Sequence, residues 1–429
     1  MEKLKTNIVC IRLSRVHVTV VVSPELCREF LHKHDSVFMS RPITMATEYA
    51  SRGYLTMGLS PWGEQNEETD NLVYYIFKRC NNLDGSVINL RLPIKHYGPN
   101  VIRKMTFSRR FFGEGGENGG PSFEEKQHIH ALYTVLKHTF AFCISDYVPW
   151  LRCLDIDGHE KNVRNSMNVF DKYHDPIIED RIKQWEDGKR KEAEDLLDIM
   201  ITLKDESGKP LLSINEIKAQ CSEFFFGVDG PAAGAEWALA EMINQPEILQ
   251  KVVEEIDRVV GKDRWIQESD VHQLNYLKTC AREAFRLHPH VPFNLPHLSS
   301  TDMEVGGYFI PKGSHVLLSR IRLGRNPETW EEPLKYNPER HLGGNVSKVD
   351  FSEPNLRFLT FSTGKHACTE HSVGTLLTIM ALGRLIQGFT WSLTPNEHYN
   401  KMDLLWCALR AIKACLWHAA TCRIKQCRK

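Results

Sequence analysis

The stretch that decides the fold runs from Phe361 to Cys368, FSTGKHAC, and a helical pattern follows it from about Ser372 to Gln387. A cysteine on a glycine-containing loop ahead of a helix is well placed to be a thiolate, because the helix N-terminus and nearby cations lower the thiol pKa. An isolated cysteine in such a place is more often a buried structural residue. The loop alone leaves both interpretations open, and other segments of the chain are needed to distinguish them.

Two further segments precede this loop in a fixed order. Glu283 and Arg286 stand three residues apart in a helical pattern, so they share a face and can pair. Taken alone, such a pair is usually solvent-exposed and contributes little to stability. Arg340 lies in the segment NPERH, residues 337–341, which by itself indicates only a turn. The order and spacing of all three segments carry the information that none of them carries separately.

The pattern around these segments predicts a mainly α chain with a small β component. Strands are expected at 8–22, 304–310 and 315–318, and helices at about 214–245, 246–260 and 274–288. Ser213 and Glu216 form a capping box, and Gly230-Pro231 predicts a kink midway through the first of these helices. Strands and helices do not alternate, which argues against a doubly wound sheet.

Composition excludes several classes of protein. The chain has 429 residues, 42% of them hydrophobic and 25% charged, as in ordinary globular proteins. The 54 Lys and Arg balance the 54 Asp and Glu, so nucleic acid is not an expected partner. The apolar run at residues 16–22 is too short to cross a bilayer, which needs about 20 residues. Twelve cysteines without a close C-x-x-C pair indicate reduced thiols rather than a disulfide scaffold.

With the three segments in this order, the chain resembles the cytochrome P450 family of haem-thiolate monooxygenases. The resemblance implies that family's fold, in which Glu283 and Arg286 lock to Arg340 and hold the scaffold beneath the haem. It also implies that Cys368 is the axial ligand of the iron of haem b, and a thiolate in that position favours cleavage of the O–O bond.

The resemblance assigns further residues to the cofactor. Phe361 and Gly364 belong to the loop that carries the ligand cysteine. His366 stands where the family has an arginine that binds a haem propionate, and imidazole is shorter and only partly charged near neutral pH. His297 stands at a second position where a propionate contact is implied.

Longer matches resemble one plant subfamily, the amino-acid N-monooxygenases that form aldoximes. They are SRPITMATEY (40–49), FFGEG (111–115), KYHDPII (172–178), EWALAEMINQP (236–246) and RHL (340–342). The subfamily N-hydroxylates an L-amino acid twice, and dehydration and decarboxylation then give the oxime, as in glucosinolate and cyanogenic glucoside formation. The resemblance therefore implies O2, an amino-acid substrate, NADPH, a separate flavin reductase, and a place on the cytosolic face of the endoplasmic reticulum membrane.

The chain departs from that pattern near the expected cofactor. Gln65 runs directly into Asn66, where the family has a haem-flanking helix. The central helix reads DGPAAG from Asp229, so Gly230 and Ala233 replace side chains expected to steer protons to bound oxygen, and Asp229 is the remaining catalytic acid. Glu370 adds charge and bulk beside Cys368, where its burial is expected to be costly.

The ends of the chain also differ from the pattern. No N-terminal hydrophobic anchor precedes the first strands, so we expect weaker membrane contacts or a cytosolic location. We expect one monooxygenase domain over 1–403, incomplete at its start and around 65–66, and a divergent basic tail over 404–429. Within the tail, 404–420 is compatible with an amphipathic helix, and the cysteine and histidine spacings fit no standard zinc finger.

Three functions remain open on the sequence. The first is haem-dependent N-hydroxylation of an L-amino acid. The second is an inactive, truncated paralogue or an incorrect gene-model product that binds haem poorly, favoured by the missing helix and the altered cysteine loop. The third is a monooxygenase with redirected chemistry, because the oxygen-steering positions at Gly230 and Ala233 have changed.

Overall fold

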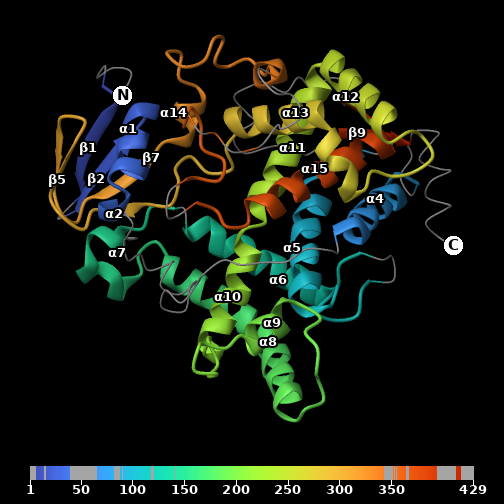
Figure 1. The fold of residues 1–429 in the computed structure, drawn as a ribbon, viewed down its shortest axis with the longest axis horizontal. Coiled ribbons are helices and arrows are strands. Elements are labelled where there is room, and N and C mark those ends of the chain that lie inside the picture. The colour runs from blue at the N-terminus through green and yellow to red at the C-terminus, as the bar shows by residue number, and fades with distance from the viewer. Residues whose placement is uncertain are drawn as a thin grey trace.

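A large block of helices and three small sheets make up the part of the chain that the structure describes (Figure 1). The computed structural model describes residues 6–13, 16–38, 65–81, 87–88, 90–116, 120–139, 141–342, 351, 353, 355–363, 367–393 and 412–416. The helices are α1 (Pro24–Arg28), α2 (Asp35–Phe38), α4 (Gln65–Asn81), α5 (Arg91–Phe107), α6 (Phe123–Thr139), α7 (Ile144–Tyr147), α8 (His159–Glu186), α9 (Leu196–Thr202), α10 (Ile214–Phe226), α11 (Asp229–Asn244), α12 (Pro246–Val259), α13 (Asn275–Leu287), α14 (Arg320–Gly324) and α15 (His371–Gly388).

Strands and short helical turns complete the fold. The strands are β1 (Ile8–Leu13), β2 (Val16–Val21), β3 (Val87–Ile88), β4 (His297–Leu298), β5 (Met303–Val305), β6 (Tyr308–Ile310), β7 (His315–Leu318), β8 (Phe389–Leu393) and β9 (Ile412–Leu416). The turns are η2 (Glu29–Lys33), η3 (Pro149–Leu154), η4 (Glu268–Gln273) and η5 (Pro338–His341).

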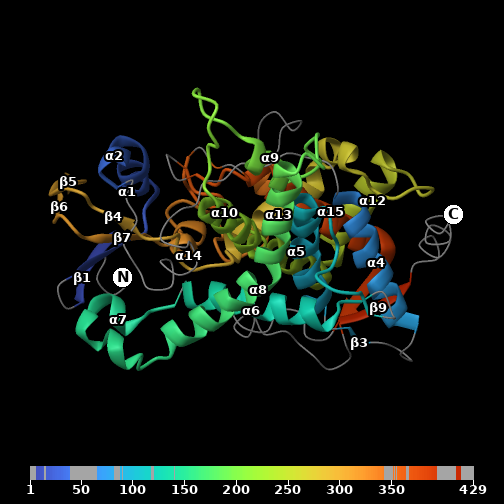
Figure 2. The same cartoon turned by 90° about the horizontal axis from the view of Figure 1, so that it is seen from below.

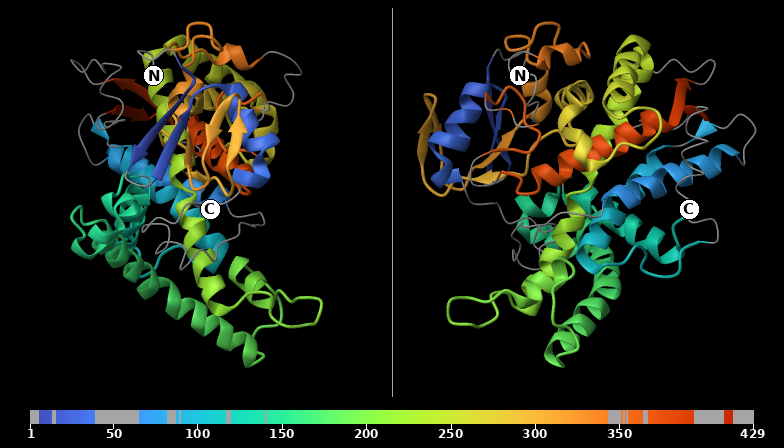
Figure 3. Two further views of the ribbon diagram at one scale, coloured as in Figure 1. Left: turned by 90° about the vertical axis from the view of Figure 1, so that its left-hand side faces the viewer. Right: turned by 45° about the vertical axis from the view of Figure 1, so that its right-hand side comes forward.

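The largest sheet joins the start of the chain to its C-terminal half. Its strand order is β1-β2-β7-β4, with β1 and β2 forming an antiparallel hairpin that the left view of Figure 3 shows in blue. β2 lies parallel to β7, with Val18 opposite His315. The apolar face of this sheet forms a separate core with α1 and η2, in which Val21 and Phe30 are buried. This core positions β7, and therefore the residues that follow it, beside the helical block.

The helical block is organised around α15. Nearly every residue of α15 from Val373 to Gly388 is buried, because neighbouring helices pack around it. α11 runs against α15, where the Thr378 hydroxyl approaches the Pro231 carbonyl at 3.5 Å. α6 and α8 lie side by side on another face (Figure 2). The buried helix after the cysteine loop is thus the centre of the main core.

Many local expectations are met. β1, β2, β5, β6 and β7 form where strands were predicted, and the fold is mainly α. Ser213 caps α10 with the reciprocal bonds of a capping box. The break expected at Gly230-Pro231 occurs slightly earlier, between α10 and α11, so both residues belong to the first turn of α11.

The tail differs from the expectation. Residues 412–416 form β9, which pairs antiparallel with β8, so the helix considered over 404–420 is wrong at these positions. The rest of the tail and residues 39–64 lie outside the described residues, and the domain boundary at 403 stays a prediction. Among the residues that the structure describes, none of the helices is long and apolar enough to span a membrane.

Candidate functional site

The cysteine loop folds back on itself before α15. The Cys368 N–H donates to the Phe361 carbonyl at 2.8 Å, and Ser362 adopts φ +59° where the chain turns. α15 starts three residues after Cys368, so the loop meets the positive end of the helix dipole. Gly364 and His366 lie outside the described residues, so their predicted cofactor contacts stay predictions.

The Cys368 side chain is accessible, yet protein surrounds it closely. Desolvation is the largest effect and raises the pKa of the thiol, and the charges of Glu370 and Glu223 raise it further, while the Glu370 backbone N–H and the Arg320 charge lower it. The expectation of a lowered thiol pKa is therefore wrong for this chain, because loss of hydration outweighs the backbone N–H and the single cation. Cys368 is thus accessible and lies among charged side chains of Glu370 and Arg320.

Phe361 ties the loop to the central helices. Its ring lies 3.1 Å from the point where a Cβ on Gly374 would stand, and that same point is 3.6 Å from Pro231 on α11. Its ring centroid is 6.3 Å from that of Phe285 on α13. The glycine of α15 therefore permits the close approach that brings the cysteine loop, α11 and α13 together.

Glu370 lies against the junction of α10 and α11. Its Oε2 lies 3.4 Å from the position of a Cβ on Gly227, between α10 and α11. Desolvation and the charge of Glu223 raise the pKa of Glu370 to about 7. The raised pKa of Glu370 thus reflects the expected cost of burying its charged form.

Asp229 opens α11 and belongs to a group of enclosed polar side chains. Desolvation raises its pKa, opposed by Lys95 and Arg91 on α5. Glu236, two turns along α11, lies 3.8 Å from Arg91 Nε, and desolvation raises its pKa to about 7. The Tyr133 hydroxyl and Glu236 Oε1 are buried and have no hydrogen-bond partner among the residues that the structure describes. Asp229 is therefore a carboxyl that holds its proton more readily than a solvated aspartate.

Arg320 is a residue near Cys368 that the sequence did not reveal. It lies two residues after β7, and its Nη1 donates to the Thr360 carbonyl at 3.2 Å, one residue before the cysteine loop. Its Nε is buried without a hydrogen-bond partner among the described residues. Desolvation lowers the pKa of Arg320 to about 10, and the Cys368 thiolate raises it. No sequence pattern identifies this arginine, because its contact with Thr360 joins segments 40 positions apart.

His297 lies in a buried position with protein partners. Its Nδ1 is 2.9 Å from the Phe38 carbonyl oxygen and its Nε2 is 3.1 Å from Asn294 Nδ2. Nδ1 therefore donates and Nε2 accepts in these two contacts. The propionate contact implied for His297 stays a prediction. Gly230 and Ala233 lie on α11, where Gly230 is buried and Ala233 is partly accessible.

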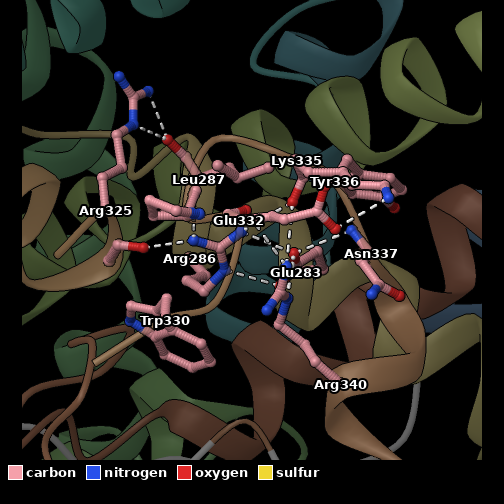
Figure 4. Close-up of polar contacts among 12 residues, drawn as sticks. Glu283, Arg286, Leu287, Arg325, Trp330, Glu332, Lys335, Tyr336, Asn337 and Arg340 are labelled. Atoms are coloured by element: carbon pink, nitrogen blue, oxygen red, sulfur yellow. Dashed lines mark hydrogen bonds and ion pairs between the residues drawn. The ribbon is translucent and has the colours of Figure 1, made fainter. Parts of the chain in front are cut away.

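The Glu283 carboxylate is the centre of a buried ion-pair network (Figure 4). Arg286 donates to both of its oxygens, at 2.7 and 2.8 Å. Arg340 Nε donates at 3.0 Å, His341 Nε2 lies at 2.7 Å, and the Asn337 N–H donates at 3.0 Å. The general expectation of an exposed pair is wrong, because both Glu283 and Arg286 are fully buried. The structure brings together the three residues that the resemblance assigned to the scaffold.

Arg286 extends this network to the segment between α14 and η5. It donates to the carbonyls of Pro333 and Lys335 at 2.7 and 3.1 Å, and also to Gly324. Its guanidinium lies 5.0 Å from the Trp330 ring centroid. Desolvation acts to raise the pKa of Glu283, but the bonds from Arg286 and His341 outweigh it and lower the value to about 2. The network joins α13 to the segment between α14 and η5.

The residues around Cys368 fit one kind of cofactor. Cys368 offers a soft anionic ligand and Phe361 an apolar surface. Arg320 Nε, which has no hydrogen-bond partner in the part of the chain that the structure describes, offers a donor for an anionic group. Haem combines an iron that binds thiolate, a flat apolar ring and two carboxylates. A mainly α fold with this loop and a buried Glu-Arg-Arg network defines the class of haem-thiolate proteins.

Residues 65–414 match the sequence profile of the cytochrome P450 family, and the chain belongs to that family. Membership implies a haem-thiolate cofactor and a monooxygenase that uses O2, a substrate and a reductase. Similar curated proteins are the tryptophan N-monooxygenase of Prunus mume and the phenylalanine N-monooxygenase of Arabidopsis thaliana, each 52% identical over 94% of this chain and over 80% and 82% of their own lengths. The tyrosine N-monooxygenase of Sorghum bicolor is 47% identical over 91% of this chain and 75% of its own.

Solved structures support the fold. A zebrafish cytochrome P450 solved with abiraterone superposes with a TM-score of 0.75 at 18% identity, covering 97% of both chains. The protein solved with progesterone gives a TM-score of 0.73 at 19% identity. The chain is therefore a cytochrome P450 related to plant amino-acid N-monooxygenases.

Proposed function

We propose that this chain N-hydroxylates an L-amino acid to its aldoxime, using O2 and electrons that NADPH supplies through a flavin reductase. The observation that carries the proposal is the 47–52% identity, over more than nine tenths of the chain, to plant enzymes named for that reaction. These relatives differ in the amino acid that their names give. N-oxidation is thus their common property, and the substrate within that class is what varies.

The residues of the site have distinct parts in this proposal. When bound, haem with a thiolate ligand supplies the oxygen-activating chemistry. Cys368 would ligate its iron, beside the positive end of α15, and coordination deprotonates a thiol whose free pKa is raised. Arg320 Nε would donate to an anionic group of the cofactor, and Phe361 would pack against its ring. Asp229 would hold a proton on the α11 side, since desolvation raises its pKa.

The proposal extends to the surroundings of the enzyme. We place the chain at the cytosolic face of the endoplasmic reticulum membrane. Support comes from apolar side chains around α7 and η3: Trp150 is 75% exposed, and Phe142, Leu154 and Ile156 are more than half exposed. Such a cluster is typical of an interaction surface. We also propose that the chain lacks the haem-flanking helix of the family, because Gln65 runs directly into Asn66.

A second candidate is a catalytically inactive paralogue with poor haem binding. Glu370 favours it, because a carboxyl with a pKa near 7 stands beside Glu223 and close to Cys368. A negative charge there opposes thiolate formation. A third candidate, redirected monooxygenase chemistry, is favoured by the absence of polar side chains at Gly230 and Ala233.

One reconstitution experiment separates the three candidates. The haem-loaded chain, a plant reductase and NADPH are incubated with each L-amino acid in turn, and aldoxime and other oxidised products are measured by mass spectrometry. Aldoxime from at least one amino acid, lost in Cys368→Ser, supports the proposal. A different oxidised product indicates redirected chemistry. NADPH consumption that yields only hydrogen peroxide, or failure to bind haem, refutes N-hydroxylation by this chain.

A further inference from the structure

Two histidines meet between α6 and α8. His128 of α6 and His174 of α8 are both fully buried, and their Nε2 atoms lie 3.0 Å apart. The contact joins residues 46 positions apart in the sequence, and Figure 2 shows the two helices running side by side. The two imidazoles therefore link α6 to α8 inside the core.

Aromatic rings pack against this pair. The ring centroid of His128 lies 4.5 Å from that of Phe170 on α8 and 4.6 Å from that of Phe112, which follows α5. The ring centroid of His174 lies 5.0 Å from that of Phe225 on α10. A positive charge on either imidazole would thus be enclosed away from water, which is costly unless a counter-charge accompanies it.

The contact between the two rings depends on how many protons they hold. Two nitrogens 3.0 Å apart form a hydrogen bond only when one carries a proton and the other presents a lone pair. Two neutral rings in opposite tautomers meet this requirement. Two imidazolium rings do not, because both Nε2 atoms then carry protons and the rings repel as like charges at close range.

The charges around the pair also oppose protonation. Desolvation, then His174, then Arg103 of α5 lower the pKa of His128 well below 6.5. Arg103 is fully buried, and its Nη1 lies 3.6 Å from Oε2 of Glu125 on α6. Tyr173 of α8 presents its ring at 6.3 Å from His128, and α10 contributes an uncharged phenylalanine. Within the described part of the chain, no carboxylate forms an ion pair with His128.

Acid therefore favours separation of the two helices. The closed pair excludes a proton that an opened, solvated His128 takes up below its ordinary pKa of 6.5. For each histidine that gains a proton on opening, the opened fraction rises about tenfold per pH unit below 6.5. α7 and η3 lie in the connection between α6 and α8, so opening also frees this segment.

We propose that the His128–His174 pair is an acid-sensitive link, which holds α6 against α8 and releases both helices, with α7 and η3 between them, when the two rings are protonated. The link involves neither the cofactor site nor the substrate, and it goes beyond the proposed function.

Hydrogen exchange measured by mass spectrometry tests the link on the purified full chain. Exchange is recorded at pH 7.5 and pH 5.5, and the rates are corrected for the intrinsic effect of pH on amide exchange. Peptides from α6 and α8 are expected to exchange about 10–100-fold faster at pH 5.5, for one or two protons gained on opening. Peptides from α12, which carries neither histidine, should change little.

Variants assign the effect to the pair. His128→Gln keeps a donor and an acceptor opposite His174 but does not titrate, so it should reduce the acceleration. The double variant His128→Phe/His174→Phe should abolish it. His130→Gln is the matched control, because His130 is exposed on α6, and it should behave as the parent chain does.

Three results would overturn the inference. The first is a parent chain with equal corrected rates at both pH values. The second is acceleration that spreads equally over α6, α8 and α12, which would show general acid unfolding. The third is acceleration that persists unchanged in His128→Gln, a comparison that holds even where the double variant does not fold. Absence of aldoxime formation would refute the proposed function and leave this inference intact.

Discussion

The Glu283 network allows a quantitative prediction of stability. Glu283→Gln removes the charge that Arg286 and Arg340 share, while both guanidinium groups stay in place. The lowering of the Glu283 pKa from 4.5 to about 2 corresponds to about 3 kcal/mol of preference for the charged form. Removing one partner of a buried pair independently costs about 3–5 kcal/mol. We expect the free energy of unfolding to fall by about 3–4 kcal/mol.

The assay is urea unfolding at pH 7, monitored by tryptophan fluorescence. Trp330, which lies over Arg286, is one of the fluorescent side chains. Glu332→Gln is the matched control, because its ion pair with Lys335 is mostly exposed and should contribute less than about 1 kcal/mol. The unfolding midpoint should fall strongly in Glu283→Gln and little in Glu332→Gln. Equal effects of the two substitutions would refute the reasoning, because they would show that burial of the network does not determine its contribution.

Three further predictions follow from the described contacts. Stability should fall as pH decreases from about 4.5 toward 2, because the Glu283 pKa is lowered in the folded chain. Glu283→Gln should flatten this part of the stability profile. A series of urea melts in which the variant keeps the parent's loss of stability at acid pH would contradict this prediction. The opposite sign holds for Glu236, because its pKa is raised to about 7 and stability therefore falls as pH rises from 4.5 to 7. Glu236→Gln should be more stable than the parent by up to about 3 kcal/mol at pH 8. A stability difference between the two chains that stays constant from pH 5 to pH 8 would exclude this. Gly234→Ala should destabilise by about 1–3 kcal/mol, because its Cβ would overlap the Phe285 ring, with Cε1 at only 2.8 Å; a parent-like thermal midpoint would contradict that packing.

The local fold was largely predictable from the sequence, because its signals lie within a few residues of one another. The segment predicted as strands at 8–22 formed β1 and β2, and Ser213 capped α10. The helical spacing of Glu283 and Arg286 predicted that they could pair. It could not predict their burial, which depends on the chain between α14 and η5 folding over them.

The environment of the candidate site was less predictable, because distant segments create it. The contact of Arg320 with Thr360, next to the cysteine loop, joins residues 40 positions apart, and the contact of His290 with Gly230 joins residues 60 positions apart. The thiol pKa was predicted with the wrong sign, because sequence identifies nearby charges but not the desolvation that outweighs them. The strand at 412–416 was missed because its apolar residues also fit a helical face, and only β8 decides between the two.

Ligation of haem iron by the Cys368 thiolate can be measured directly. The measurement is the ferrous–CO difference spectrum of the purified chain supplied with haem, recorded alongside Cys368→Ser and with Cys153→Ser as the control for an exposed cysteine elsewhere. We expect a strongly red-shifted Soret band for the parent and for Cys153→Ser, and its loss in Cys368→Ser. A parent without that band, or a Cys368→Ser variant that retains it, would show that Cys368 does not ligate the iron as a thiolate.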